Sequence, residues 1–353
     1  MTSPSAERRL LRATMSQIFA EHCTAQSAAL GAAAGWDAGL WRLLEAGGLT
    51  AVGIPERSGG SGGELADAAV VLIEAGRFAA AVPLAETLGC GLWLARLGIT
   101  MPPGPLTLAL WHSLVIEPRD GGYAVQGTLC RVPYGRVAGT VVAVCGDGSC
   151  LLLPPGSVLR PGANLAAEPR DDIQVDVVVS GDVVRHAAEG SGIARILMRL
   201  TRTLLLSGAA ERALELTVSY VTEREQFGKA LARQQAVQQH LARMAGEVAL
   251  VRSTASAAVQ ACADHLDDLP AAWFAVTVAK AEASRAAGTI AAIAHQLHGA
   301  IGTTNEHRLR LTTTRLWSWR DEDGSESQLF AELGRYACAA GSGRLWPLLT
   351  GTR

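Results

Sequence analysis

The stretch Arg224-Glu-Gln-Phe-Gly-Lys229, followed by Gln234-Gln235, lies between two long helical patterns. Apolar residues recur every three or four positions in four stretches, over residues 193–223, 229–264, 270–298 and 326–341. This period predicts long helices, and Gly228 permits the turn between the first two. Helices of this length that pack on one another predict an antiparallel bundle in the last part of the chain.

The pattern changes towards the N-terminus. Residues 5–100 again show a helical period, which Met101-Pro-Pro-Gly-Pro105 ends. Short runs rich in Val, Leu and Thr then predict strands at 106–111, 123–126, 140–144, 151–153 and 173–179. We therefore predict a mainly α protein with an N-terminal helical domain (1–103), a small β-barrel-like domain (104–188) and a C-terminal four-helix bundle (189–353). No strand is followed by G-x-G-x-x-G, which disfavours a Rossmann domain.

Composition narrows the class of protein. A chain of 353 residues with 49% hydrophobic and 18% charged residues is neither disordered nor a coiled coil. Lys and Arg number 31 against 33 Asp and Glu, so the basic field that nucleic acid requires is missing. We expect no nucleic-acid partner.

The sequence also predicts a cytoplasmic location. The seven cysteines form no C-x-x-C pair, which is typical of reduced thiols. Charges at Glu7, Arg8, Arg9 and Arg12 interrupt the N-terminus before an apolar signal segment, and no apolar run reaches about 18 residues. We expect neither a signal peptide nor a membrane span.

Two stretches suggest a ligand at helix ends. Arg224, Phe227 and Gln235 bring a guanidinium, an aromatic ring and an amide to one helix junction, which suits a phosphate-bearing ligand. A solvated surface turn is the alternative interpretation. Gln296-Leu-His-Gly-Ala-Ile-Gly302 fits a helix C-cap with Gly299 or Gly302 in the left-handed conformation. His295 and His298 form H-x-x-H, but without a third ligand at a telling spacing we expect no metal site.

Two further stretches complete the pattern. In Trp317-Ser-Trp-Arg-Asp-Glu-Asp-Gly-Ser-Glu326 three carboxylates lie beside two tryptophans, as a general base with a raised pKa requires. A solvated acidic helix N-terminus explains the same residues. Pro55-Glu-Arg-Ser-Gly-Gly60, followed by residues 67–77, indicates a loop and a buried helix without chemistry.

These four stretches, in this order, resemble the acyl-CoA dehydrogenase family over most of the chain. Residues 55–60 and 67–77 are similar to its P-E-x-x-G-G and D-A-x-x-x-x-E-x-G-R signature. The junction at Arg224 matches R-x-x-F-G with a later Gln, and the stretch from Gln296 matches Q-x-x-G-G-x-G with Ala300 in place of the second glycine.

The resemblance implies a fold, a cofactor and a reaction. In this family FAD lies between two subunits, a carboxylate removes the α-proton of an acyl-CoA, hydride passes to the flavin, and an electron-transfer acceptor reoxidises it. The contacts to the adenosine-diphosphate end of FAD, which the neighbouring subunit chiefly binds, correspond to Arg224, Phe227, Gln235, Gln296 and Gly299. The catalytic Glu of an E-G-T turn corresponds to Asp323, followed by Gly324 and Ser325, which we group with the cofactor contacts. Arg199 corresponds to an Arg near the CoA moiety.

The sequence departs from the family in the parts that hold its own flavin. The T-E-P…G-S-D segment is absent, and W-I-T aligns with Arg131-Val132-Pro133, so proline replaces the threonine donor. Asp323 is one methylene shorter than Glu, and a displacement of about 1 Å can cost about 10²-fold in rate.

This contrast favours a particular assembly. The chain resembles the shortened subunits of actinobacterial heterotetrameric acyl-CoA dehydrogenases of steroid breakdown. We therefore interpret it as a subunit of an α2β2 enzyme that completes the FAD site of a second acyl-CoA dehydrogenase subunit. One alternative is a homo-oligomeric flavoenzyme with Asp323 as base. Another is a catalytically inactive scaffold or acyl-CoA-binding protein.

Overall fold

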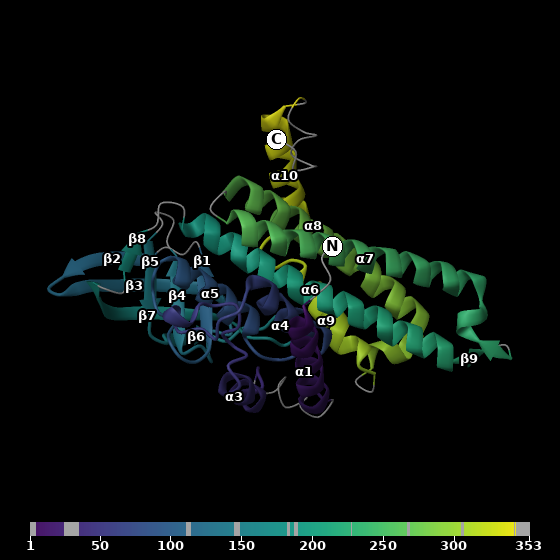
Figure 1. The fold of residues 1–353 in the computed structure, drawn as a ribbon. Helices are drawn as coiled ribbons and strands as arrows, with labels where there is room; N and C mark the ends of the chain where they lie inside the picture. Colours follow the sequence, from purple (N-terminus) through teal and green to yellow (C-terminus); the bar gives the residue numbers. More distant parts are fainter. Residues whose placement is uncertain are drawn as a thin grey trace.

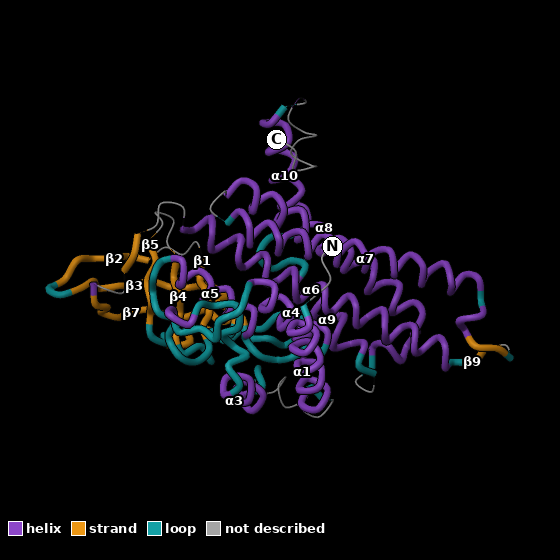
Figure 2. Tube along the Cα trace, in the orientation of Figure 1, coloured by secondary structure: helices purple, strands orange, loops and turns teal. Residues whose placement is uncertain are grey.

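A computed structural model describes residues 5–24, 35–110, 114–144, 149–181, 184–186, 190–226, 228–266, 269–304, 307–341 and 343. Helices dominate, and a small β region lies between two helical parts of the chain (Figures 1 and 2). The predicted fold class is confirmed. The domain limits at 103/104 and 188/189 stay predictions.

The first helical part contains α1 (Ala6–His22), α3 (Ala38–Ala46), a 3-10 turn (Glu56–Ser58), α4 (Leu65–Arg77) and α5 (Leu84–Arg96). A capping box between Glu64 and Asp67 starts α4, because each side chain accepts a backbone N–H that the first turn leaves free. Arg8 of α1 donates to Asp67 at 2.8 Å, so α1 is held against that helix start.

The β region consists of two four-stranded sheets, with strand orders β1-β4-β5-β8 and β2-β3-β7-β6. The strands are β1 (Leu106–Leu110), β2 (Leu114–Arg119), β3 (Gly122–Pro133), β4 (Thr140–Val144), β5 (Ser149–Leu153), β6 (Ser157–Arg160), β7 (Arg170–Ser180) and β8 (Val184–His186). Only β1 and β4 pair in parallel among the described strands. Alternate residues such as Val125, Leu151 and Ile173 face each other between the sheets and form one core.

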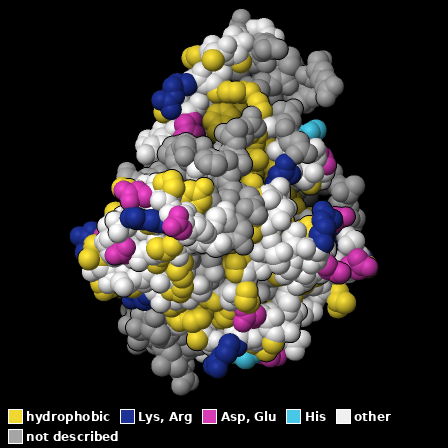
Figure 3. Space-filling view, turned by 90° about the vertical axis from the view of Figure 1, so that its left-hand side faces the viewer, with side chains coloured by type: hydrophobic (Ala, Val, Ile, Leu, Met, Phe, Trp, Pro, Cys, Tyr) yellow, Lys and Arg dark blue, Asp and Glu magenta, His cyan; other side chains and the backbone are white. Residues whose placement is uncertain are grey.

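The outer face of the sheet β2-β3-β7-β6 is exposed. Val115 of β2, Val178 of β7 and Leu159 of β6 are open to solvent there. Figure 3 views the molecule from its β end and shows such hydrophobic side chains interspersed with charged ones. The region therefore has one buried face and one mixed face, as antiparallel sheets commonly do.

The last part contains α6 (Gly190–Glu223), α7 (Gln235–His265), α8 (Leu269–His298), α9 (Leu309–Trp319) and α10 (Glu326–Ala340). The hairpin of β9 (Glu225–Gln226) and β10 (Lys229–Ala230) joins α6 to α7, followed by a 3-10 turn (Leu231–Arg233). The predicted start of the second helix at 229 is therefore wrong by six residues, because Lys229 and Ala230 first pair with Gln226 and Glu225 across the turn at Gly228 (φ +75°). Helices α6, α7 and α8 run side by side towards the hairpin, and α10 projects from them (Figure 1). Among the described residues no helix is both long and apolar enough to cross a membrane.

Helices α4 and α6 touch backbone to backbone. A Cβ on Gly208 would lie 1.9 Å from the Ile73 carbonyl oxygen, and one on Gly76 would lie 2.2 Å from that of Leu205. Both positions need a residue without a side chain, since real Cβ atoms do not approach so closely. The close approach joins the first helical part to the bundle through one core.

Gly208→Ala should lower the free energy of unfolding by about 1–3 kcal/mol, because overpacking forces α4 and α6 apart. Gly246→Ala is the matched control, since Gly246 lies exposed within α7 and a Cβ there meets nothing within 4 Å. That change should raise the free energy of unfolding by up to about 1 kcal/mol through helix propensity. Denaturant titration measures both, and equal effects would contradict the close approach.

Candidate functional site

The residue predicted as base lies at a cavity between the helices and the β region. Asp323, in the turn between α9 and α10, lines a cavity of about 280 Å³. Arg131, Val132 and Pro133 of β3 line the same cavity, together with apolar side chains from β1 and α6. The structure thus brings together two segments that the sequence linked only through a family resemblance.

Asp323 is the counter-ion of a buried arginine. Its carboxylate accepts a hydrogen bond from Arg202 Nε at 3.0 Å. Arg202, on α6, is 2% exposed and also donates a hydrogen bond to Glu86 of α5 at 2.9 Å. It forms a further ion pair with Glu322 at 3.3 Å. This hydrogen bond occupies Oδ2 of Asp323 and holds the carboxylate beside the buried Arg202 guanidinium.

The neighbouring carboxylate is held equally firmly. Glu322 accepts hydrogen bonds from Arg170 at 2.7 and 3.0 Å and from Asn164 at 2.9 Å. Burial alone would raise the pKa of Glu322, but Arg170, Arg202 and the hydrogen bonds outweigh it and lower the pKa to about 2. Glu322 is therefore a poor base at neutral pH.

These ions form one charge cluster between the three parts of the chain. Glu168 accepts from Trp319 Nε1 at 2.9 Å and pairs with Arg170 at 3.2 Å, which extends the network into the β region. We use "charge cluster" for six residues: Glu86, Glu168, Arg170, Arg202, Glu322 and Asp323. Burial raises the pKa of Glu86, and its pairing with Arg202 opposes that shift.

Two buried cations fix the turn that carries Asp323. Lys280 of α8 donates to the carbonyl oxygens of Arg320 at 2.9 Å and Gly324 at 3.2 Å, and Arg199 Nε donates to that of Asp323 at 3.0 Å. The backbone needs this support because Asp323 has φ +57°, in the left-handed region. Burial of Lys280 lowers its pKa to about 7.

The segment expected to face a flavin ring, Arg131 to Pro133, offers no free backbone N–H at two of its three residues. The Arg131 backbone N–H donates a hydrogen bond to Asp172 Oδ1 at 2.8 Å, and Pro133 has no backbone N–H. The Pro133 carbonyl already accepts a hydrogen bond from the Thr107 hydroxyl. These two positions therefore give no backbone N–H to the acceptor atoms of a flavin ring.

The predicted contacts to the other end of FAD gather elsewhere, at the far end of the bundle. Arg224 directly follows α6, Gln235 opens α7, and Gln296 lies in the last turn of α8 before Gly299, with φ +65°. All four are exposed. Phe227 lies outside the described residues.

A small apolar cluster holds these segments together. Leu297, next to Gln296, packs on the buried Val221, Leu231 and Val237 of the α6–α7 junction. The two ligand-type stretches of the sequence therefore lie side by side, as a shared ligand requires.

The remaining predicted residues have structural partners. Both Nη atoms of Arg199 bind the Glu332 carboxylate at 2.9 Å, and Arg199 is 3% exposed. Ser325 closes a capping box with Gln328 at the start of α10. His295 contacts Thr313 at 2.9 Å, whereas His298 contacts the Ala294 carbonyl at 2.7 Å. The substrate role of Arg199 and the cofactor role of Ser325 stay predictions.

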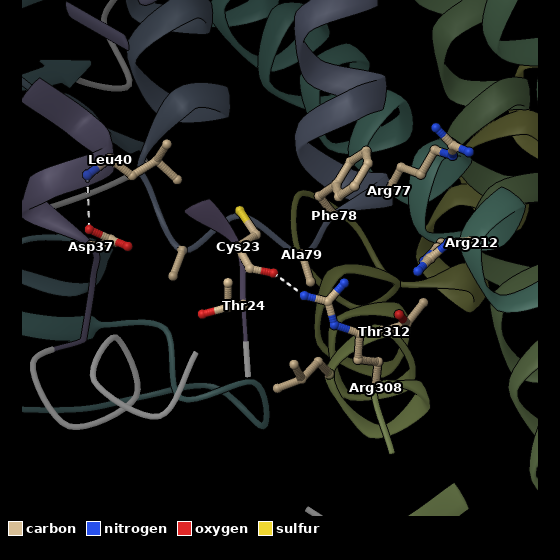
Figure 4. Close-up of a pocket in the computed structure, with 12 residues that line it drawn as sticks. Cys23, Thr24, Asp37, Leu40, Arg77, Phe78, Ala79, Arg212, Arg308 and Thr312 are labelled. Carbon is tan, nitrogen blue, oxygen red and sulfur yellow. Dashed lines mark hydrogen bonds between the residues drawn. The ribbon is translucent and has the colours of Figure 1, made fainter. Parts of the chain in front are cut away.

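A second pocket, shown in Figure 4, lies between α1, α3, α4, α6 and α9. It has about 30 Å³, and its arginines already have partners: Arg77 and Arg212 bind Glu215, and Arg308 binds the Cys23 carbonyl. Burial raises the pKa of the Cys23 thiol to about 12, which keeps it protonated. We assign no ligand to this pocket.

Sequence reasoning missed Arg170, Arg202, Glu86 and Lys280. A signal was available for two of them. Glu86 interrupts an apolar run and Lys280 lies in an alanine-rich helix, and a charge amid buried positions needs a partner. The partner itself is not visible in the sequence.

Two helical parts around a β region, with an acidic turn facing that region across a cavity, define the acyl-CoA dehydrogenase type of fold. Residues 5–99 match the family model of the acyl-CoA dehydrogenase N-terminal domain, and residues 190–326 match that of the C-terminal domain. The acyl-CoA dehydrogenase IpdE2 of Mycobacterium tuberculosis is 32% identical over 324 residues, which cover 88% of this chain and 90% of the relative. This chain belongs to the acyl-CoA dehydrogenase family.

Solved structures agree with this membership. The Tcur3481-Tcur3483 steroid ACAD variant has a TM-score of 0.84 at 28% identity and covers 95% of this chain and 99% of that chain. A chain of the ChsE4-ChsE5 complex from Mycobacterium tuberculosis has a TM-score of 0.87 at 23% identity, with 97% and 100% covered, and supports the fold alone.

Arg202→Met should lower the free energy of unfolding by about 3–5 kcal/mol, because it leaves Glu86 and Asp323 without their buried partner. Arg119→Met is the control, since Arg119 forms an exposed pair with Glu117. It should cost less than about 1 kcal/mol. Denaturant titration compares the two variants, and a small effect at Arg202 would contradict the role of the charge cluster.

Lys280 should make the free energy of unfolding rise between about pH 7 and about pH 10.5. Over that interval the unfolded lysine binds a proton that the folded one has lost. Lys280→Met should remove this rise, whereas Lys229→Met, at an exposed position, should leave it unchanged. Thermal unfolding across this pH interval provides the measurement, and an unaltered profile in Lys280→Met would refute the assignment.

Proposed function

We propose that this chain is one subunit of a heteromeric, FAD-dependent acyl-CoA dehydrogenase and completes the FAD site of a partner subunit. Family membership supports oxidoreductase activity on an acyl-CoA thioester and implies FAD. The observation that carries the proposal is a contrast between two sites of the chain. The expected contacts to the adenosine end of FAD are exposed and lie side by side, whereas Asp323 is hydrogen-bonded to Arg202 within the charge cluster.

The exposed end fits the phosphate-bearing part of FAD. Arg224 offers a guanidinium, which binds phosphate oxygens through two hydrogen bonds. Gln235 and Gln296 add side-chain amides. Nothing lies within 4 Å of a Cβ built on Gly299, so a ligand can approach that backbone. When bound, FAD would accept the hydride that leaves the acyl group.

The partner subunit would supply what this chain lacks. It would hold the flavin ring, provide the base for α,β-desaturation and pass electrons to an electron-transfer acceptor. In an α2β2 assembly two chains of each kind would share the cofactors. The ChsE4-ChsE5 complex and the Tcur3481-Tcur3483 steroid ACAD are similar to this chain in fold. We propose a bulky, steroid-type acyl-CoA as substrate and a cytoplasmic location.

Flavin absorbance tests this proposal directly. The chain purified alone should be colourless, and co-expression with the acyl-CoA dehydrogenase subunit encoded nearest to it should give a yellow complex. Flavin bound by this chain alone would instead support a homo-oligomeric enzyme with Asp323 as base. Absence of flavin in both preparations would support an inactive scaffold or acyl-CoA-binding protein.

Arg224→Ala should weaken FAD binding to the complex by about 10- to 100-fold, since a hydrogen bond to a charged group contributes about 1.5–3 kcal/mol. Arg243→Ala, at an exposed position of α7, is the control and should keep FAD affinity unchanged. Flavin fluorescence during dialysis measures the affinity.

Asp323→Ala in the same complex separates the two enzymatic alternatives. Turnover within a few-fold of the wild type is expected if the partner supplies the base. A loss of 10²-fold or more, of the size that a misplaced catalytic group causes, would place the chemistry in this chain. The flavin content of the variant serves as the folding check.

A further inference from the structure

Three aromatic rings pack together beside the proposed FAD contacts. Tyr220 in the last turn of α6 stacks on His298, the last residue of α8, with ring centroids 4.5 Å apart and an interplanar angle of 20°. His307, before α9, lies edge-on to His298 at 4.7 Å and to Tyr220 at 6.1 Å. We call Tyr220, His298 and His307 the aromatic stack.

The aromatic stack connects the two backbones that carry the cofactor contacts. The Tyr220 carbonyl accepts the Arg224 N–H at 2.8 Å, so Tyr220 fixes where the chain leaves α6. His298 directly precedes Gly299 and follows Gln296 by two residues. Its Nδ1 is held by the Ala294 carbonyl at 2.7 Å, and only 3% of the residue is exposed. A movement between these two rings would therefore change the spacing between Arg224 and the Gln296–Gly299 turn.

We propose that Tyr220 and His298 are positioning residues for FAD, and that their stack holds the spacing of its contacts only while His298 is neutral. This inference rests on the proposed function and deepens it. Neither ring is assigned contact with the cofactor. Both act through the backbones of Arg224 and Gly299.

The surroundings of His298 favour its neutral form. Burial lowers the pKa of His298, and His307 and His295 lower it further, against the opposing backbone hydrogen bonds to Ala294 and Leu216. Burial and Arg212 of α6 lower the pKa of His307. Among the described residues, the charged or titratable groups that act on the two histidines are His295 on α8, His307 before α9, and Arg212 on α6, which also pairs with Glu215.

The sign of the pH effect follows from these directions. Because the folded pKa of His298 lies below the unfolded value of 6.5, the unfolded or opened state binds the proton more readily. The packed arrangement therefore loses stability as the pH falls below about 6.5. Protonation of His298 would place a desolvated charge in the stack, beside His307 and His295.

The test follows FAD retention by the heteromeric complex between about pH 8 and about pH 5, a range that brackets the unperturbed histidine pKa. His298→Phe keeps an aromatic ring but cannot titrate. Flavin absorbance after gel filtration should show wild-type loss of FAD on acidification and retention by His298→Phe, with similar affinity near pH 8. An acid loss as large in His298→Phe as in the wild type would overturn the proposal.

Matched variants separate positioning from a general effect. His265→Phe is the control, because His265 is exposed at the opposite end of α7 from Gln235, and it should keep the wild-type pH profile. Tyr220→Ala should weaken FAD binding about 10-fold at every pH, and Tyr220→Phe should restore it. Full FAD affinity in a folded Tyr220→Ala complex would also overturn the proposal.

A measurement without FAD distinguishes this inference from the proposed function. In the full chain alone, NMR titration of the imidazole resonances should give His298 a pKa below 6.5, and a value at or above 6.5 would overturn the inference by itself. A wild-type complex that holds no flavin near pH 8 would instead overturn the proposed function.

Discussion

The buried guanidinium of Arg202 is the interaction on which the arrangement of the parts depends. Arg202 is almost fully buried, so its charge is no longer solvated by water. Its carboxylate partners are therefore needed to compensate that charge. Those partners come from α5 and from the turn after α9, and Arg170 brings in the β region. Three separate stretches of chain are therefore held at one point, and the orientation of Asp323 follows from it.

The same interaction helps to hold the turn that carries Asp323 in place. Lys280 and Arg199 bind the carbonyl oxygens on one side, while Arg202 and Arg170 bind the carboxylates on the other. Proton abstraction needs an oxygen that can reach the substrate. In this chain Asp323 Oδ2 and both carboxylate oxygens of Glu322 accept hydrogen bonds from buried arginines, and the exposed Arg224, Gln235 and Gln296 lie at the opposite end of the bundle.

Much of the fold was predictable because the spacing of apolar residues within a helix is visible in a short stretch of sequence. The helices of the bundle follow from apolar spacing, and the junction at Gly228 follows from a residue that tolerates positive φ. Strands β2 and β6 were missed because they are largely exposed and carry little apolar alternation, as in Glu117-Pro118-Arg119. Helix α9 was missed as well. The charge cluster was not predictable, since Glu86, Arg202 and Glu322 each resemble a solvated charge until folding brings them together.

Helix α6 links the charge cluster at Arg202 to the proposed FAD contacts at Arg224. At a rise of 1.5 Å per residue, Arg202 and Arg224 are about 33 Å apart along its axis. Substitutions so far apart usually contribute independently to stability. Substitutions in the charge cluster should therefore leave the surface around Arg224 unchanged, and substitutions around Arg224 should leave the charge cluster intact.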